Sequence, residues 1–154
     1  MINLKKLIIS IFIPLAAGGI GSLLGGNPEI YNTIVKPSFS PPGWVFPVAW
    51  TILYILMGIS FYIVYNSDSI YRKRAILVYF IQLTVNMLWS LLFFRLHLYF
   101  ISALWIVLLI LLVAYMVYLF FKINKKAGYL QIPYLLWLTF ACILNFAVYF
   151  LNAV

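Results

Sequence analysis

Residues 36–65 read KPSFSPPGWVFPVAWTILYILMGISFYIVY. The first twelve of these residues include four prolines. Because proline removes a backbone donor and interrupts helices, this part predicts a conformationally restricted loop. The residues from Pro47 to Tyr65 carry no charge, and about 20 mainly apolar residues are enough to cross the hydrocarbon core of a bilayer. The stretch therefore predicts a rigid loop that leads directly into a membrane-spanning helix.

The rest of the chain is similarly apolar. Of its 154 residues, 67% are hydrophobic and 8% are charged, and the mean hydropathy is +1.13. A soluble domain of this size needs more polar surface to cover its core. Five segments are long and apolar enough to span a membrane, at about residues 4–24, 47–65, 75–94, 99–121 and 130–152. We therefore predict an all-α integral membrane protein, with residues 1–154 forming a single bundle of five transmembrane helices.

The formal net charge of +8 comes from ten Lys and Arg residues against Glu29 and Asp68. The basic residues lie in short gaps between apolar segments, which indicates membrane topology and argues against a nucleic-acid partner. Eight of the ten lie at the start of the first segment, after the second or after the fourth. The positive-inside rule then predicts a cytoplasmic N-terminus and an outer C-terminus in a bacterial plasma membrane, with the proline-rich loop outside.

The N-terminal segment allows two interpretations. Residues 1–19 have the basic start and apolar stretch of a signal peptide. The apolar pattern continues to Leu24 without a clear cleavage site, which favours a retained helix. Gly21 and Gly25 form a GxxxG pair that would let another helix approach closely, although such a pair also arises by chance in a glycine-rich helix.

Three predicted helices place aromatic and amide side chains on one face at helical spacing. These faces contain Trp50 and Tyr54; Gln82, Asn86, Trp89 and Phe93; and Tyr134, Trp137, Ala141, Asn145 and Asn152. An amide that faced lipid would lack a hydrogen-bond partner, so these faces should turn inward. Such faces serve either as contacts between helices or as the wall of a cavity for a large, flat, mainly apolar ligand, and the spacing leaves both open.

Several kinds of site are disfavoured by the residues present. No acidic residue lies in a predicted span, which argues against a carboxylate dyad or a proton-relay pump. The chain has one histidine, His97, in a predicted loop, and one cysteine, Cys142, so we expect no metal site and no intrachain disulfide.

Four stretches of the chain resemble the TspO/translocator protein family, also known as peripheral benzodiazepine receptors. They are 14-PLAAGGIGS-22, 36-KPSFSPPGWVFPVAWTILYILMG-58, 82-QLTVNMLWSLLFF-94 and 133-PYLLWLTFACILNFAVYFLN-152. The resemblance implies a five-helix bundle, often a homodimer, with a cavity that the first loop covers as a lid. Members of this family bind porphyrins such as protoporphyrin IX, isoquinoline carboxamides and benzodiazepines, and some bacterial members degrade protoporphyrin in light.

The resemblance also implies site residues. The two pocket tryptophans of the family correspond to Trp50 and Trp137, which we expect to hold the ligand and to take part in any photochemistry. The other expected ligand-binding residues are Tyr31, Pro41, Pro42, Tyr54, Asn86, Trp89, Phe93, Ala141, Leu144 and Asn145. No cofactor is required, since porphyrin would be the ligand or substrate. The cholesterol motif of eukaryotic members has Leu or Val, then Tyr, then a basic residue. Here no basic residue follows Val148 and Tyr149, which argues against cholesterol binding.

The leading hypothesis is therefore a membrane protein that binds tetrapyrroles and degrades them with light and oxygen. The sequence offers no acid–base machinery, so such an activity would depend on the photochemistry of the ligand itself. A transporter of porphyrin or other lipophiles and a non-catalytic sensor or scaffold are the alternatives. The odd number of spans and the lack of an evident internal repeat argue against an inverted-repeat transporter.

Overall fold

The computed structural model describes residues 3–27 and 29–152. Their elements are α1 (Leu4–Gly25), α2 (Ile30–Thr33), α3 (Val45–Tyr65), α4 (Arg72–Ser90), the π-helical turn η1 (Leu91–Arg95), α5 (Tyr99–Ile123) and α6 (Lys125–Asn152). Five helices, counting α4 and η1 as one, are long and apolar enough to cross a membrane. The predicted all-α membrane fold with five spans is confirmed.

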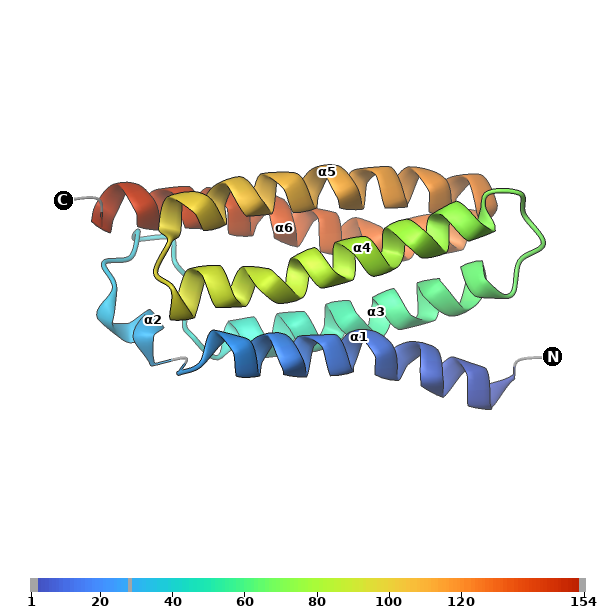
Figure 1. The fold of residues 1–154 in the computed structure, drawn as a ribbon, viewed down its shortest axis with the longest axis horizontal. Helices are drawn as coiled ribbons and strands as arrows, with labels where there is room; N and C mark the ends of the chain where they lie inside the picture. The colour runs from blue at the N-terminus through green and yellow to red at the C-terminus, as the bar shows by residue number, and fades with distance from the viewer. Residues whose placement is uncertain (1–2, 28, 153–154) are drawn as a thin grey trace.

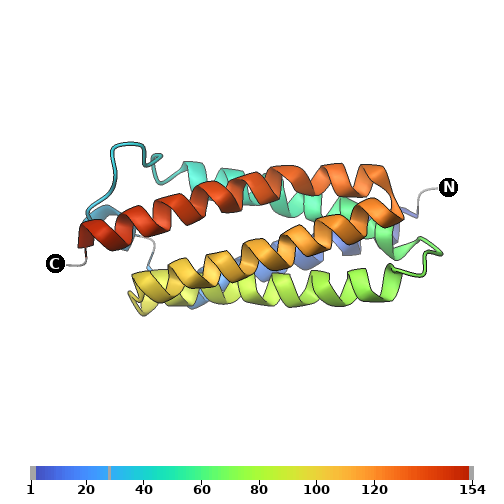
Figure 2. The ribbon, with the colours of Figure 1, turned by 90° about the horizontal axis from the view of Figure 1, so that it is seen from above.

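The five long helices form a closed ring (Figures 1 and 2). Around the ring, α1 packs against α3, α3 against α6, α6 against α5, α5 against α4, and α4 against α1. Long helices that follow one another in sequence run in opposite directions (Figure 1). The connections that follow α3, η1 and α5 are short, whereas a longer segment joins α1 to α3. The bundle thus has two distinct ends. One carries the N-terminus, and the other carries the C-terminus and the segment from Gly26 to Trp44 (Figure 1).

Charge is divided unequally between these two ends. The starts of α1 and α4 and the turn between α5 and α6 all lie at the end of the N-terminus (Figure 1), and they carry eight of the ten basic residues. We call this the basic end. Lys36 and Arg95 lie at the opposite end, with the loop that precedes α3.

Three helices begin earlier than the hydropathy pattern predicted. α3 begins at Val45, which places Pro47 in the first turn, where its missing N–H costs little. α4 begins at Arg72 and α6 at Lys125, both several residues before their apolar segments. Hydropathy marks the part of a helix that lies in hydrocarbon, whereas the helix itself continues into the headgroup region, where charged side chains are solvated. The sequence also did not predict α2 or η1.

Glycines set the closest approaches between helices. A Cβ added to Gly58 of α3 would lie 2.3 Å from the Cα of Ile11 in α1. On the other side of α1, a Cβ on Gly21 would lie 3.3 Å from the carbonyl oxygen of Met87, and one on Gly25 would lie 3.3 Å from the Cβ of Ser90. The Gly21–Gly25 pair therefore packs against α4, as small residues do where membrane helices pack closely.

Replacing Gly58 with Ala should destabilise the bundle. The new methyl group would meet the backbone of α1, which has no flexible side chain to move aside, so the two helices must separate. We expect a loss of about 1–3 kcal/mol in the free energy of unfolding, as for other overpacked sites. Thermal unfolding in detergent measures this loss.

Gly19→Ala is the matched control, because a Cβ at Gly19 meets no atom within 4 Å. It should leave stability unchanged or raise it slightly through better helix propensity. Equal melting temperatures for the Gly58→Ala and Gly19→Ala variants would contradict the close packing of α1 on α3.

Candidate functional site

A partly open cavity of about 550 Å³ lies between α1, α3 and α4, near the loop end of the bundle, and we call it the internal cavity. Its lining residues come from α1, the chain around Gly26 and Gly43, the first half of α3, and the end of α4: Leu15, Gly18, Gly19, Ser22, Gly25, Gly26, Gly43, Phe46, Pro47, Trp50, Thr51, Tyr54, Asn86, Trp89, Ser90 and Phe94. Most of this lining is apolar or aromatic. Its size and composition are typical of a site for a small organic ligand.

The α1 wall of the cavity is made largely of glycine. A Cβ on Gly18 would lie 2.2 Å from the ring of Tyr54, so only glycine leaves room for that ring. Next to it, Gly19 faces open space. One wall of the cavity is thus nearly free of side chains, while α3 and α4 supply aromatic rings. A flat ligand could lie against such a wall and stack on the rings.

A chain of hydrogen bonds holds the amide of the cavity in place. The hydroxyl of Tyr54 donates to Oδ1 of Asn86 at 3.0 Å, and Nδ2 of Asn86 donates to the hydroxyl of Tyr134 at 2.8 Å. The same Tyr134 hydroxyl donates to Oε1 of Gln82 at 2.8 Å. These bonds join α3, α4 and α6, and all four side chains are buried. The prediction that the amides turn inward is confirmed for Gln82, Asn86 and Asn145.

A second polar cluster holds the indole of Trp89 in place. The indole Nε1 of Trp89 donates to Oδ1 of Asn145 at 3.0 Å. Oγ of Ser102 donates to the same oxygen, and Nδ2 of Asn145 donates to the carbonyl of Tyr99. Phe93, in η1, stacks on Trp89 with ring centroids 5.2 Å apart. Asn145 thus acts on the cavity by orienting the indole that lines it.

Trp50 and Trp137 are in contact but border different spaces. Their ring centroids lie 6.5 Å apart at an interplanar angle of 85°, and Trp50 also stacks on Tyr54 at 5.4 Å. Trp50 lines the internal cavity. Trp137 lines a separate lateral groove of about 650 Å³ on the outer side of α3 and α6, together with Pro41, Ala49, Ile52, Leu53, Pro133, Leu136 and Phe140. Its indole N–H is buried and has no hydrogen-bond partner among the described residues.

The loop before α3 is held at two points. The hydroxyl of Tyr31 bonds with Oγ of Ser40 and donates to the carbonyl of Pro41, while its ring packs edge-on against Phe46. Farther along, the backbone N–H of Val35 donates to Oδ1 of Asn152, and Nδ2 of Asn152 donates back to the carbonyl of Val35. These contacts tie the loop to the start of α3 and the end of α6.

The structure brings together only part of the expected ligand-binding set. Four members line the internal cavity: Trp50, Tyr54, Asn86 and Trp89. Three others pack directly against its wall residues: Tyr31, Phe93 and Asn145. Pro41 and Trp137 line the lateral groove. The remaining three, Pro42, Ala141 and Leu144, line neither space.

Sequence reasoning missed the wall that α1 contributes. Gly18 and Gly19 lie in a quoted stretch, 14-PLAAGGIGS-22, but glycine has no side chain that suggests chemistry. From the sequence, the glycines of this helix are expected only to pack against another helix. Sequence reasoning also missed Phe46, which packs against the loop and lines the cavity. Its position next to Pro47 at the start of α3 could have indicated that it lies near the cavity.

Replacing Asn86 with Leu should destabilise the protein and loosen Tyr54. The change removes both of its hydrogen bonds and leaves the hydroxyls of Tyr54 and Tyr134 short of a partner. Such bonds contribute about 0.6 kcal/mol on average in membrane bundles, so a loss of about 1–2 kcal/mol is expected. A double-mutant cycle with Tyr54→Phe measures the coupling, which should be non-zero; additive effects would contradict the Tyr54–Asn86 bond.

Comparison with known proteins identifies the family. The family model described as TspO/MBR family matches residues 10–151. The chain is 40% identical to the tryptophan-rich protein TspO of Archaeoglobus fulgidus, over 98% of this chain and 99% of that protein. It is 37% identical to the tryptophan-rich sensory protein of Cereibacter sphaeroides (86% of this chain, 82% of that protein) and 31% identical to the human translocator protein (77% and 72%). With five spans and a match over nearly its whole length, the chain is an integral membrane protein that belongs to the TspO/MBR family.

Proposed function

We propose that this protein binds a porphyrin, such as protoporphyrin IX, in the internal cavity. Membership of the family supports a ligand-related role in the membrane in general terms. The observation that carries the finer proposal is the shape of the cavity, in which a glycine wall on α1 faces the aromatic side chains of α3 and α4. A macrocycle is flat, rigid and mainly apolar, and it would gain from burial and from offset stacking on indole and phenol rings.

The amide of Asn86, which is held in place by hydrogen bonds, would orient a bound ligand. Because Asn86 is held by Tyr54 and Tyr134, it would meet a ligand without first losing side-chain freedom. The same features suit the isoquinoline carboxamide and benzodiazepine classes of drug, which are mainly apolar, carry aromatic rings and have a carbonyl acceptor. No metal or other cofactor is needed for this mode of binding.

We further propose that bound protoporphyrin is degraded in light, with dioxygen as the oxidant. Trp50 lines the cavity and would contact the macrocycle, whereas Trp137 contacts Trp50 edge-on from the other side. An excited porphyrin can exchange an electron with an adjacent indole, so we assign Trp50 the direct redox role and Trp137 a role through Trp50. Acid–base groups have no part in this step.

A titration in darkness and then under light tests both proposals. Purified protein should bind protoporphyrin saturably, shift the Soret band, quench tryptophan fluorescence, and bleach the ligand to a defined product under aerobic light. Trp50→Phe should retain binding within a few-fold and lose most of the bleaching, because phenylalanine stacks but is much harder to oxidise. Trp137→Phe should lose less of the bleaching. Trp105→Phe is the control, since Trp105 lines neither space and donates instead to the carbonyl of Val85.

Two variants with a larger side chain, tested in the same titration, show which of the two spaces the ligand occupies. Gly19→Leu would fill the internal cavity, and Ala49→Leu would fill the lateral groove. If the proposal is right, affinity falls about tenfold or more for Gly19→Leu and little for Ala49→Leu. The opposite pattern would place the porphyrin in the groove. If all tryptophan variants bleach alike, the indoles are only walls and the proposed redox role fails.

We also propose that the loop from Gly26 to Trp44 acts as a lid over the cavity. Its prolines restrict its conformations, which lowers the entropy lost when it closes on a ligand. The contacts between Val35 and Asn152 and between Tyr31, Ser40 and Pro41 would hold the closed state.

The lid proposal predicts faster release of ligand when these restraints are removed. Pro41→Ala combined with Pro42→Ala should raise the dissociation rate of porphyrin several-fold, as should Asn152→Ala by removing both bonds to Val35. Stopped-flow measurement of the Soret change gives these rates. Thr139→Ala is the control, because Thr139 is exposed on α6 and its hydroxyl bonds only within its own helix. Unchanged release in both lid variants would contradict the proposal.

One observation favours a second function, the transport of lipophiles. The lateral groove opens on the outer side of α3 and α6, and its Trp137 contacts Trp50, which lines the internal cavity. A ligand that entered the groove from the bilayer would meet this pair of rings on its way to the cavity. Flux of porphyrin into sealed vesicles distinguishes transport from binding alone. A ligand-dependent change in oligomer size without flux or bleaching would instead favour a sensor or scaffold.

We also propose an oligomeric state, a membrane and an orientation for the protein. We expect a homodimer in a bacterial plasma membrane, with the basic end in the cytoplasm and the lid outside. The concentration of basic residues at one end supports this orientation.

A further inference from the structure

A third hollow lies at the basic end of the bundle, far from the internal cavity. It has a volume of about 460 Å³ and lies between the start of α1, the end of α3 and the start of α4. Its lining residues are Lys6, Tyr65, Asn66, Arg72, Lys73 and Ile76. Three of the six carry a positive charge and none carries a carboxylate. We call this space the basic hollow.

Hydrogen bonds between α1 and α3 position the first of these cations. The backbone N–H of Asn3 donates to the hydroxyl of Tyr62, which ties the start of α1 to the last turns of α3. The side chain of Asn3 then caps α1 by accepting from the backbone N–H of Lys6. As a result, the ammonium group of Lys6 lies 5.9 Å from the centre of the Tyr65 ring.

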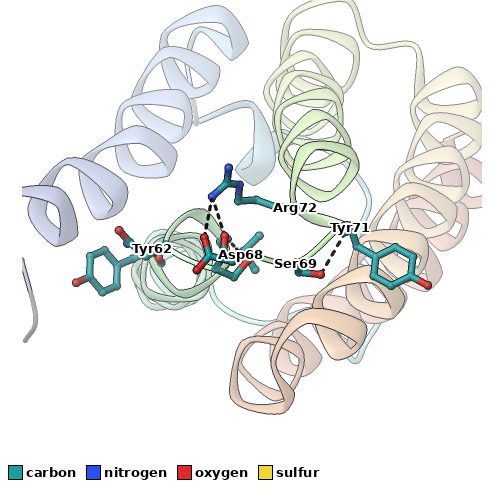
Figure 3. Close-up of polar contacts among 8 residues, drawn as sticks. Tyr62, Asp68, Ser69, Tyr71 and Arg72 are labelled. Carbon is teal, nitrogen blue, oxygen red and sulfur yellow. Dashed lines mark hydrogen bonds and ion pairs between the residues drawn. The ribbon is translucent and has the colours of Figure 1, made fainter.

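Arg72 is held by its neighbours through one nitrogen. Its Nη1 donates to the carbonyl oxygen of Ser67 at 2.7 Å and lies 3.9 Å from Oδ1 of Asp68, an exposed carboxylate (Figure 3). Among the described residues, no hydrogen bond or ion pair is made through Nη2 or Nε, so these two groups can still donate to another acceptor. Arg72 is also the first residue of α4, where the helix dipole favours an anion, although its own backbone N–H already donates to the carbonyl oxygen of Ser69.

Arg72 is partly buried, whereas Lys6 and Lys73 are exposed, so all three cations can reach a phosphate group at the membrane surface. A guanidinium group can donate two parallel hydrogen bonds to a phosphate, and the two lysines would add point charges beside it. The same hollow also has an apolar floor, Ile76, one turn further into α4. Beyond it, Leu77 and Phe80 are exposed on the side of the helix. A free inorganic phosphate would gain nothing from this apolar surface, but a phospholipid would.

We propose that the basic hollow binds the headgroup of an anionic phospholipid from the surrounding bilayer. Its phosphate would lie between Arg72, Lys6 and Lys73, and an acyl chain would run along Ile76 and the exposed face of α4. Basic pockets between membrane helices are known to hold anionic headgroups. This inference is independent of porphyrin binding, because it concerns the other end of the bundle.

Lipid binding can be measured by native mass spectrometry of the full chain in detergent. The probes are phosphatidylglycerol and phosphatidylcholine with identical acyl chains, and inorganic phosphate as a competitor. The test variant is Lys6→Gln with Arg72→Gln and Lys73→Gln. The matched control is Lys122→Gln with Lys125→Gln and Lys126→Gln, which removes the same charge from the same end but outside the hollow. Thermal unfolding in neutral detergent checks that each variant is folded.

We expect wild type to retain phosphatidylglycerol in preference to phosphatidylcholine. The test variant should lose this preference, with at least about tenfold weaker binding, whereas the control variant should change less than about twofold. Equal losses in both variants would show general attraction to charge and overturn the proposal. So would equal binding of the two lipids, or displacement of the lipid by millimolar phosphate, which would indicate a site for the free anion. If the triple variant does not fold, Lys6→Gln with Lys73→Gln leaves the Arg72 contacts intact and should still weaken lipid binding several-fold.

Discussion

Inside a bilayer no water is present to satisfy a polar group, and the architecture of this protein depends on that constraint. Backbone groups are satisfied by the helices themselves. Side-chain amides need partners from other helices, and Asn86 and Asn145 find them in Tyr54, Tyr134 and Trp89. The bonds that satisfy Asn86 and Asn145 therefore also determine which helices meet and how the aromatic rings between them are oriented.

The same residues serve both packing and the cavity. In the sequence, contact between helices and the wall of a ligand site appeared as competing interpretations of one aromatic and amide pattern. In the structure they are compatible: Asn86 joins three helices and lines the cavity, and Asn145 bonds with α5 while it orients Trp89. Glycine completes the arrangement, because Gly58 lets α1 approach α3 closely while Gly19 leaves space beside it.

The two ends of the bundle offer different chemistry. The end with the loop is poor in charge and rich in aromatic and proline residues, and the internal cavity lies close to it. The basic end carries most of the charge, and it has a hollow of its own, lined by cations. A flat, apolar ligand and an anionic headgroup would thus bind at opposite ends of the bundle.

The class of fold, the number of spans and the segments that form them can be predicted from the sequence, because hydropathy and helical length are local properties. The sequence also identified the inward faces, since an amide in lipid has no alternative to turning inward. It did not determine the ends of the helices, because α4 and α6 continue beyond the hydrocarbon into polar surroundings.

Only the tertiary structure decided which of these faces share a space. The order of helices around the ring puts α1 beside α3 and α4, so a glycine wall that carries no chemical signal in the sequence becomes part of the cavity. The same order of helices places Trp137 in the lateral groove and not in the cavity. In the sequence, Trp137 lies on the aromatic face of its helix just as Trp50 lies on the aromatic face of α3. Residue spacing along one helix defines a face, but the volume between faces depends on the mutual placement of several helices, which is not a local property of the chain.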